Sequence, residues 1–314
     1  MNWKKLQNGS DIRGVALEGI EGEHVNLTPE VIETIAKSFV RWIRNNSDCE
    51  MPTIAVGMDC RLSGSSIKSA FVKGAVEAGA NVVDCGLAST PAMFMTTISE
   101  HVKATASVMV TASHLPFNRN GLKFFTPKGG LDSKDIASIL TIAENGEFAF
   151  EGAKGSSSTL DFMDIYSRHI ADYICEGVNA DDYQHPLKGM HIIVDAGNGN
   201  GGFFEKILSM LGADTKGSQF LDPDGRFPNH IPNPEDREAM ASVCKAVEES
   251  DADLGVIFDT DVDRSAIIGR KGEPINRNFL IALISSVILD EHPGSTIVTD
   301  SVTSDGLAEY ISEK

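Results

Sequence analysis

The sequence predicts an α/β fold made of similar domains in tandem. Two observations predict it: short apolar runs alternate with amphipathic stretches, and this alternation starts again twice along the chain. The first restart follows the Gly- and Ser-rich stretch 151–159, and the second begins near Gly272. We therefore expect domain I at residues 1–158, domain II at 159–270 and a partial domain III at 271–314.

The first block contains the clearest single elements. The apolar run Thr53–Gly57 predicts a buried strand. Ser65–Ala78 predicts a helix, because its apolar residues recur at the spacing that places them on one face. The remaining elements expected here are the strands Asn81–Cys85 and Ala104–Val110 and the helix Asp132–Glu144.

The later blocks repeat this pattern. The second is expected to contain a connecting helix, Leu160–Cys175, the strands Met190–Asp195 and Leu254–Phe258, and the helices Phe203–Leu211 and Ala239–Ser250. The third is expected to contain the helix Arg277–Leu289, the strand Ser295–Asp300 and the helix Ser304–Ser312. At about forty residues, this third block is too small to bury a core of its own. We therefore expect the chain to be a truncated form of a longer protein.

Composition limits the classes of function. The formal net charge of -18 argues against a nucleic-acid partner, although a local group of Arg and Lys could still hold a small phosphorylated ligand. No apolar run reaches the roughly 18 residues of a membrane span. The five cysteines are scattered and form no Cys-x-x-Cys pair, which favours reduced thiols. The expected compartment is the cytoplasm, or else a plastid or other organelle after removal of a presequence.

The segment Thr111–Lys123 (TASHLPFNRNGLK) is the most specific stretch. It follows an expected buried strand, and ligands of open α/β sheets bind beyond the carboxyl ends of strands. Ser113 supplies a hydroxyl with His114 beside it, and Gly121 allows the backbone to approach a ligand closely. The alternative is a Ser/Asn/Gly-rich turn in which Ser113 only caps the backbone.

The segment Phe258–Arg264 (FDTDVDR) carries three alternating carboxylates at the end of an apolar run. Carboxylates this close repel one another unless a cation lies among them. Mg²⁺ is the natural candidate, since it prefers oxygen ligands from carboxylates and substrate phosphate. Arg264 adds a fork suited to a phosphate oxygen. The alternative is a solvated acidic turn; a calcium EF-hand loop fits poorly because no Gly or Glu stands at the required offsets.

Three weaker stretches are ambiguous by themselves. Asp195–Gly202 (DAGNGNGG) could cradle a phosphate or could allow tight packing of a helix on a sheet. Gly9–Gly14 (GSDIRG) places Arg13 in a Ser/Gly turn that could hold phosphate or be an ordinary surface turn. Asp59, Arg61 and Ser63 form a comparable loop after the first expected strand.

Together and in this order, these stretches resemble the α-D-phosphohexomutase family, which contains phosphomannomutase, phosphoglucomutase and phosphoglucosamine mutase. The resemblance covers nearly the whole chain. The family motifs D-I-R-G, D-x-R-x-S-G, T-A-S-H-N-P-x-x-Y-N-G-x-K, F-P…P-N-P and D-x-D-x-D-R are similar to Asp11–Gly14, Asp59–Gly64, Thr111–Lys123, Phe227–Pro234 and Asp259–Arg264, respectively.

The chain departs from the family pattern at a few positions. Leu115 and Arg119 replace the usual Asn and Tyr, and Thr260 and Val262 stand where glycines are common. A β-branched residue would be strained there if the loop required a positive φ.

The resemblance implies mixed sheets sandwiched by helices, a phosphoserine loop in domain I and a metal-binding loop in domain II. It also implies an isomerase that moves a phosphoryl group between the 1- and 6-positions of glucose or mannose phosphate. The intermediate would be a hexose bisphosphate. The family's sugar-recognition loop and its C-terminal domain IV are expected beyond Lys314.

The resemblance also assigns roles to residues. Phosphorylated Ser113 would donate the phosphoryl group, with Lys123 assisting proton removal, His114 positioning and Arg13 stabilising the transferred group. Phosphate would be bound by Arg264, Arg61 and Asn120, and Mg²⁺ by Ser113, Asp259, Asp261 and Asp263. Two alternatives remain at this point: a phosphoglucosamine mutase, or an inactive truncated member of the family.

Overall fold

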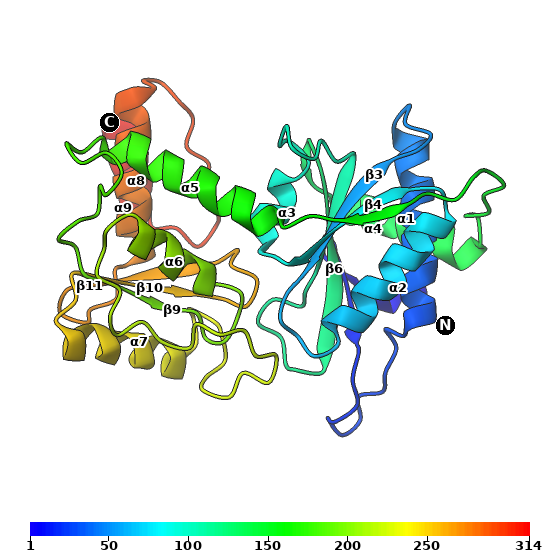
Figure 1. Ribbon diagram of the computed structural model, residues 1–314, viewed down its shortest axis with the longest axis horizontal. Helices are drawn as coiled ribbons and strands as arrows, with labels where there is room; N and C mark the ends of the chain where they lie inside the picture. Colours follow the sequence, from blue (N-terminus) through cyan, green and yellow to red (C-terminus); the bar gives the residue numbers. More distant parts are fainter.

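The computed structural model describes residues 1–314 and divides its strands between two sheets (Figure 1). The larger sheet has the order β1-β2-β6-β5-β3-β4-β8, and β7 pairs with β6 at its edge. Strands β5, β3, β4 and β8 run parallel, whereas the pairs β5·β6, β6·β2 and β2·β1 are antiparallel. The expectation of a mixed sheet is therefore confirmed. These strands are β1 (Gln7–Asn8), β2 (Asp11–Val15), β3 (Thr53–Met58), β4 (Asn81–Leu87), β5 (Ala106–Val110), β6 (Arg119–Thr126), β7 (Gly129–Gly130) and β8 (Ser157–Thr159).

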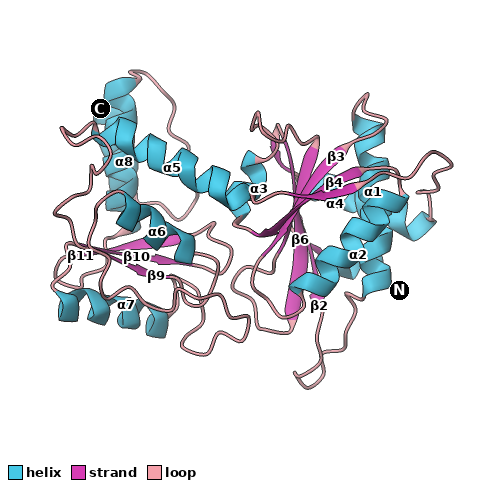
Figure 2. Ribbon diagram, viewed as in Figure 1, coloured by secondary structure: helices cyan, strands magenta, loops and turns pink.

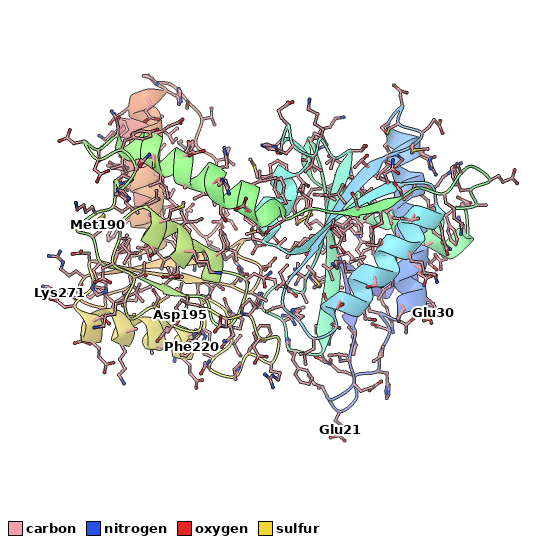
Figure 3. The ribbon with its side chains drawn as sticks, viewed as in Figure 1. Glu21, Glu30, Met190, Asp195, Phe220 and Lys271 are labelled. Atoms are coloured by element: carbon pink, nitrogen blue, oxygen red, sulfur yellow. The ribbon has the colours of Figure 1, made fainter.

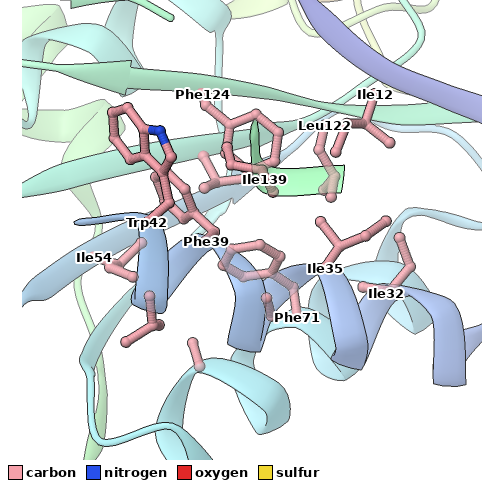
Figure 4. Packing of buried hydrophobic residues seen from close by; sticks show 14 of the residues in the cluster. Ile12, Ile32, Ile35, Phe39, Trp42, Ile54, Phe71, Leu122, Phe124 and Ile139 are labelled. Carbon is pink, nitrogen blue, oxygen red and sulfur yellow. The ribbon is translucent and has the colours of Figure 1, made fainter. Parts of the chain in front are cut away.

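Helices cover both faces of this sheet (Figure 2). One face packs against α1 (Pro29–Asn46), α2 (Gly64–Glu77) and α4 (Ser133–Asn145), and a short 3₁₀ turn, Trp3–Leu6, precedes β1. Figure 4 shows the aromatic centre of this layer, where the ring centroids of Phe39 and Phe124 lie 4.7 Å apart. The other face packs against α3 (Thr90–Met95) and the start of α5 (Phe162–Val178).

Local sequence explains where these helices begin. Thr28 caps α1 by accepting a hydrogen bond from the Val31 amide, and Pro29 provides the fixed φ suited to the first turn. Asp132 and Asp135 form a reciprocal capping box at the start of α4. Each helix then buries an apolar face on the sheet, which supplies most of its stability.

The smaller sheet has the order β11-β10-β9 and lies between α6 and α7 (Figure 1). Its strands are β9 (Ile192–Asp195), β10 (Leu254–Phe258) and β11 (Ser265–Gly269), and its helices are α6 (Gly202–Met210) and α7 (Arg237–Ser250). Ile192 and Val194 pack toward α6, while Ile193 packs toward α7, as strand alternation requires. The helix α5 connects the two sheets, and α8 (Arg277–Glu291) and α9 (Asp305–Glu313) follow β11.

Most expected elements are present with shifts of a few residues at their ends, but one expectation was wrong. Residues 295–300 form no strand, although their β-branched composition favours one. Side-chain preference alone does not make a strand, because the backbone needs a hydrogen-bonded neighbour and none pairs with this segment. Val298 is 88% exposed as a result.

Two further differences concern the first sheet. The helix α1 and the strand β6 were not among the expected elements. The predicted boundary between residues 158 and 159 lies inside β8, since Thr159 pairs with Asp84 of β4. None of the helices combines the length and the apolar character that a bilayer crossing requires.

Candidate active site

Ser113 lies in a tight loop between β5 and β6. The segment 111–123 is only partly irregular, because β6 begins at Arg119 and pairs with β5 and β2. Ser113 is 4% exposed and has a left-handed φ of 54°. Such a backbone conformation in a non-glycine residue costs about 1–3 kcal/mol and persists only where the surroundings enforce it.

A buried pair from the loop after β3 enforces this conformation. Asp59 accepts a hydrogen bond from Thr111 Oγ1 at 2.7 Å, and Thr111 Oγ1 accepts one from the Ser113 amide at 2.9 Å. Arg61 donates to the carbonyl oxygens of Ser113 and Leu115, each at 2.5 Å. It also donates to the carbonyls of residues 116 and 119. The guanidinium is thus occupied by the backbone of the serine loop.

The aspartate trio (Asp259, Asp261 and Asp263) comes from the other sheet, directly after β10. The Ser113 hydroxyl donates to Asp259 Oδ2 at 3.1 Å, although the two residues are 146 positions apart. Asp259, Asp261 and Asp263 each offer an oxygen within 4.8 Å of the others. Both loops therefore extend from the carboxyl ends of parallel strands and meet at the seam between the two sheets.

Arg264 and Lys123 supply positive charge around this meeting point. Arg264 Nη2 donates to Ser113 Oγ at 2.9 Å and to Asp259 Oδ2 at 2.8 Å. Lys123 Nζ contacts Asp263 and lies 3.2 Å from Asp261 Oδ2. Burial tends to lower the pKa of Lys123, but the charges of Asp261 and Asp263 outweigh it and raise the pKa overall.

The carboxyl groups of the trio are not equivalent. Burial and the neighbouring carboxylates Asp261 and Asp263 raise the pKa of Asp259. Burial also acts to raise the pKa of Asp263, but the adjacent Lys123 ammonium lowers it overall. Asp261 is fully buried, and its Oδ1 has no hydrogen-bond partner. An orphaned anionic oxygen beside two further carboxylates fits a cation that prefers oxygen ligands.

The other predicted site residues lie around the serine loop. His114 Nδ1 accepts a hydrogen bond from Arg264 Nη2 at 2.5 Å, and burial together with the Arg264 and Arg13 charges lowers the pKa of His114. Arg13 Nη2 donates to Asp11 at 2.7 Å, and its Nη1 reaches the Ala112 carbonyl at 3.5 Å.

Asn120 is fully buried. Its side-chain Nδ2 donates to Ser63 Oγ at 2.8 Å, and its side-chain Oδ1 accepts from the backbone amide of Gly121. Arg61 and Asn120 therefore have side chains that are already engaged within the protein.

The glycine-rich turn after β9 forms a packing surface rather than an open cradle. A Cβ at Gly199 would lie 2.9 Å from the Thr260 backbone, and one at Gly202 would lie 2.2 Å from the Leu221 carbonyl. Asn200 from the same turn donates to the carbonyls of Met58 and Ala88, at 3.2 and 2.6 Å. The turn therefore fastens the second sheet to the loops of the first.

A second network lies behind this turn. Asp195 lies at the end of β9 (Figure 3) and is fully buried. Both of its carboxylate oxygens lie 3.1 Å from His230 Nε2. Phe220 packs edge-on against the same imidazole, with ring centroids 5.3 Å apart. Burial tends to lower the pKa of His230, but the hydrogen bond and charge of Asp195 outweigh it and raise the pKa.

One contact of the site had no counterpart in the sequence analysis. Thr90, at the first turn of α3, donates to Asp261 through both its hydroxyl and its amide. The Ser-Thr-Pro run at 89–91 is a typical helix start, and that signal gives no hint of a partner in the second sheet.

Comparisons with known proteins identify the family that this sequence matches. Residues 4–150 match the family described as phosphoglucomutase/phosphomannomutase, alpha/beta/alpha domain I, and residues 164–272 match domain II of the same family. A phosphoglucomutase from Neisseria meningitidis serogroup B is 30% identical over 95% of this chain. A phosphomannomutase from Salmonella typhimurium is 34% identical over 90% of it.

A solved structure extends the likeness to three dimensions. A phosphoglucomutase/phosphomannomutase family protein from Burkholderia thailandensis superposes with a TM-score of 0.80, at 27% sequence identity and over 97% of this chain. The chain spans 61% and 60% of the length of the Neisseria and Salmonella relatives and 63% of the Burkholderia chain.

Proposed function

This chain belongs to the phosphoglucomutase/phosphomannomutase family, and from that premise we propose that it serves a phosphohexomutase reaction. The reaction moves a phosphoryl group between the 1- and 6-hydroxyls of glucose or mannose phosphate, through a hexose bisphosphate. An enzyme that catalyses it is an isomerase. The observation that carries the proposal is the contact of the Ser113 hydroxyl with both Asp259 and Arg264 across the seam.

Mg²⁺ is the cation that we propose for the trio. Asp259, Asp261 and Asp263 would hold it with an oxygen of phosphorylated Ser113, and the orphaned Asp261 Oδ1 supports this donor set. When bound, such an ion neutralises charge on phosphoryl oxygens. A phosphoserine brings close to two negative charges, and Arg264 and Lys123 alone would not offset these together with the three carboxylates.

The chain's own residues then divide the remaining work. Arg264, already within reach of Ser113 Oγ, would hold oxygens of the transferred group, and His114 would keep the Arg264 fork in place. Arg13 borders the same loop from β2 and adds positive charge.

Proton transfer is assigned to Lys123. The sugar oxygen bonds to phosphorus as the bond from phosphorus to Ser113 Oγ breaks. Lys123 would give a proton to the departing Ser113 Oγ and take one from the attacking hydroxyl, so that protons balance. This Lys123 is fixed by its contacts with Asp261 and Asp263.

Arg61 and Asn120 receive a different role from the one that the sequence suggested. Because their side chains are engaged with the protein backbone and with Ser63, we propose that they shape the serine loop instead of binding substrate phosphate. All five cysteines are free thiols, which supports a reducing compartment such as the cytoplasm. The division of the chain into domains I, II and III remains a prediction.

Covalent labelling tests the proposal. The protein is incubated with radiolabelled hexose bisphosphate and the label on the chain is measured, followed by assays on glucose, mannose and glucosamine phosphates. Ser113→Ala should remove the label, whereas Ser158→Ala, which changes an exposed serine of β8, should keep it. Label retained on the Ser113→Ala protein would eliminate Ser113 as the phosphoryl carrier.

A further inference from the structure

One contact between the two sheets reaches the aspartate trio itself. Thr90 Oγ1 donates to Asp261 Oδ2 at 2.6 Å, and the Thr90 amide donates to the Asp261 carbonyl at 2.8 Å. Thr90 is 7% exposed and Asp261 is 0% exposed, so water does not compete for either bond. Both the backbone and the side chain of Asp261 are therefore held from the first sheet.

The two oxygens of Asp261 have different surroundings. Oδ2 accepts from Thr90 and faces Lys123, whereas Oδ1 is buried and has no partner. A hydroxyl donor on one oxygen limits rotation of the carboxylate. A buried carboxylate oxygen without a hydrogen-bond donor is unfavourable in free energy. Because Oδ2 is held by Thr90, Oδ1 is the oxygen that remains available to coordinate a cation.

The local fold explains why Thr90 is free to make both bonds. Ser89 caps α3 by accepting from the Ala92 amide, and the amides of a first helical turn have no partner within the helix. The Ala88 carbonyl, just before the cap, accepts from Asn200 of the other sheet. The segment 88–90 is thus held by Asn200 at Ala88 and by the helix cap at Ser89.

We propose that Thr90 is a positioning residue for the cation site. It sets the orientation of Asp261 so that Oδ1 is the ligand oxygen, and it makes formation of the site depend on docking of the two sheets. The proposal rests on the proposed function, because it assumes that the trio holds a divalent cation. It adds a residue of α3 to a site whose three aspartate ligands follow β10.

Metal binding tests this role directly. The affinity of the full chain for Mn²⁺, used as a probe for Mg²⁺, is measured by calorimetry or by the spin-resonance signal of free Mn²⁺. Thr90→Val keeps the shape and removes the donor, and it should weaken binding about tenfold or more, as loss of an outer partner of a ligand does. Thr90→Ser keeps the hydroxyl and should bind within about threefold of the original protein.

Thr96→Val is the matched control. Thr96 is also fully buried beside α3, but its hydroxyl donates to the Met93 carbonyl at 2.7 Å and has no link to the trio. This variant should keep the original affinity. Thr90→Ala, which removes the same donor without adding an apolar methyl, replaces Thr90→Val if that variant does not fold.

The outcomes separate the two proposals. If the unchanged chain binds no Mn²⁺, the cation site of the proposed function fails. If it binds and Thr90→Val binds equally well, or Thr90→Ser binds as weakly as Thr90→Val, only the role of Thr90 fails. Failure of both Thr90→Val and Thr90→Ala to fold while Thr96→Val folds would also overturn it, since Thr90 would then serve general stability.

Discussion

Replacing Arg61 with Met is expected to lower the free energy of unfolding by about 3–5 kcal/mol. Arg61 Nε lies 3.3 Å from Asp59 Oδ2, and the two side chains are 1% and 0% exposed. Methionine fills a similar space but leaves the Asp59 carboxylate buried without its cation. Removing one partner of a buried pair is costly for that reason, even though the intact pair contributes little net stability.

The same change removes the donors that close the serine loop. Four backbone carbonyls between residues 113 and 119 lose a hydrogen bond from Arg61. An unsatisfied buried acceptor costs about 1–3 kcal/mol. These costs do not add to the first, because neighbouring effects overlap and a loosened loop admits water. We therefore expect the total loss in the free energy of unfolding to stay within the same range of about 3–5 kcal/mol.

The loss should grow with pH. Burial raises the pKa of Asp59 to about 6 although Arg61 opposes it, so the pKa rises further without Arg61. A carboxyl whose folded pKa exceeds its unfolded value gives stability that is fully present below the unfolded pKa and is lost as pH rises through the folded pKa. In the Arg61→Met protein the loss of stability continues to higher pH, because the folded pKa of Asp59 is higher there. The difference in free energy of unfolding between the original protein and the variant should therefore be larger at about pH 8 than at about pH 5.

Urea unfolding followed by tryptophan fluorescence measures these effects. Both tryptophans report on the first sheet, since Trp42 belongs to its main apolar cluster and Trp3 packs against it. The control is Arg119→Met: Arg119 pairs with Glu23 where the side chains are 34% and 29% exposed. That change should cost less than about 1 kcal/mol. A similarly small loss for Arg61→Met, or an equal loss at both pH values, would refute the reasoning.

Three further predictions concern the second sheet. Val262 has a φ of 65°, so Val262→Gly relieves backbone strain and should change the free energy of unfolding by no more than about 1 kcal/mol; a loss above about 2 kcal/mol in urea would contradict this. Asp195 raises the pKa of His230, so stability from this pair is fully present below the unfolded pKa and is lost as pH rises through the folded value. The melting temperature of His230→Gln should therefore fall further below the original at about pH 6 than at about pH 9, and an equal deficit at both would exclude the charge effect. Asn200→Ala should cost about 2 kcal/mol in urea unfolding, because the buried Ala88 carbonyl loses its side-chain donor while the Met58 carbonyl keeps the Ala88 amide; no loss would show that water replaces Asn200.

The sequence was most informative where local pattern and local structure coincide. The strand Leu254–Phe258 has the predicted bounds, because a short apolar run directly before an acidic loop has few alternatives. At Val262 the sequence posed only a condition, that a β-branched residue would be strained if the loop required a positive φ, and the loop does take a φ of 65° there.

The unpredicted parts depend on contacts between distant segments. The expected strand at 295–300 had the right side chains and no neighbour to pair with. Arg61 resembled a phosphate ligand because a sequence does not show that backbone carbonyls surround the guanidinium. Thr90 was missed because its partner, Asp261, lies 171 residues away in the other sheet.

The separation of Ser113 and Asp259 by 146 residues has a consequence for biosynthesis. A ribosome adds roughly 5–20 residues per second, so about 7–30 s pass between the synthesis of Ser113 and that of Asp259. During this interval the nascent chain can complete its first sheet while the serine loop faces solvent. The contact between the Ser113 hydroxyl and Asp259 can therefore form only after the later half of the chain has been translated and has docked on the first sheet.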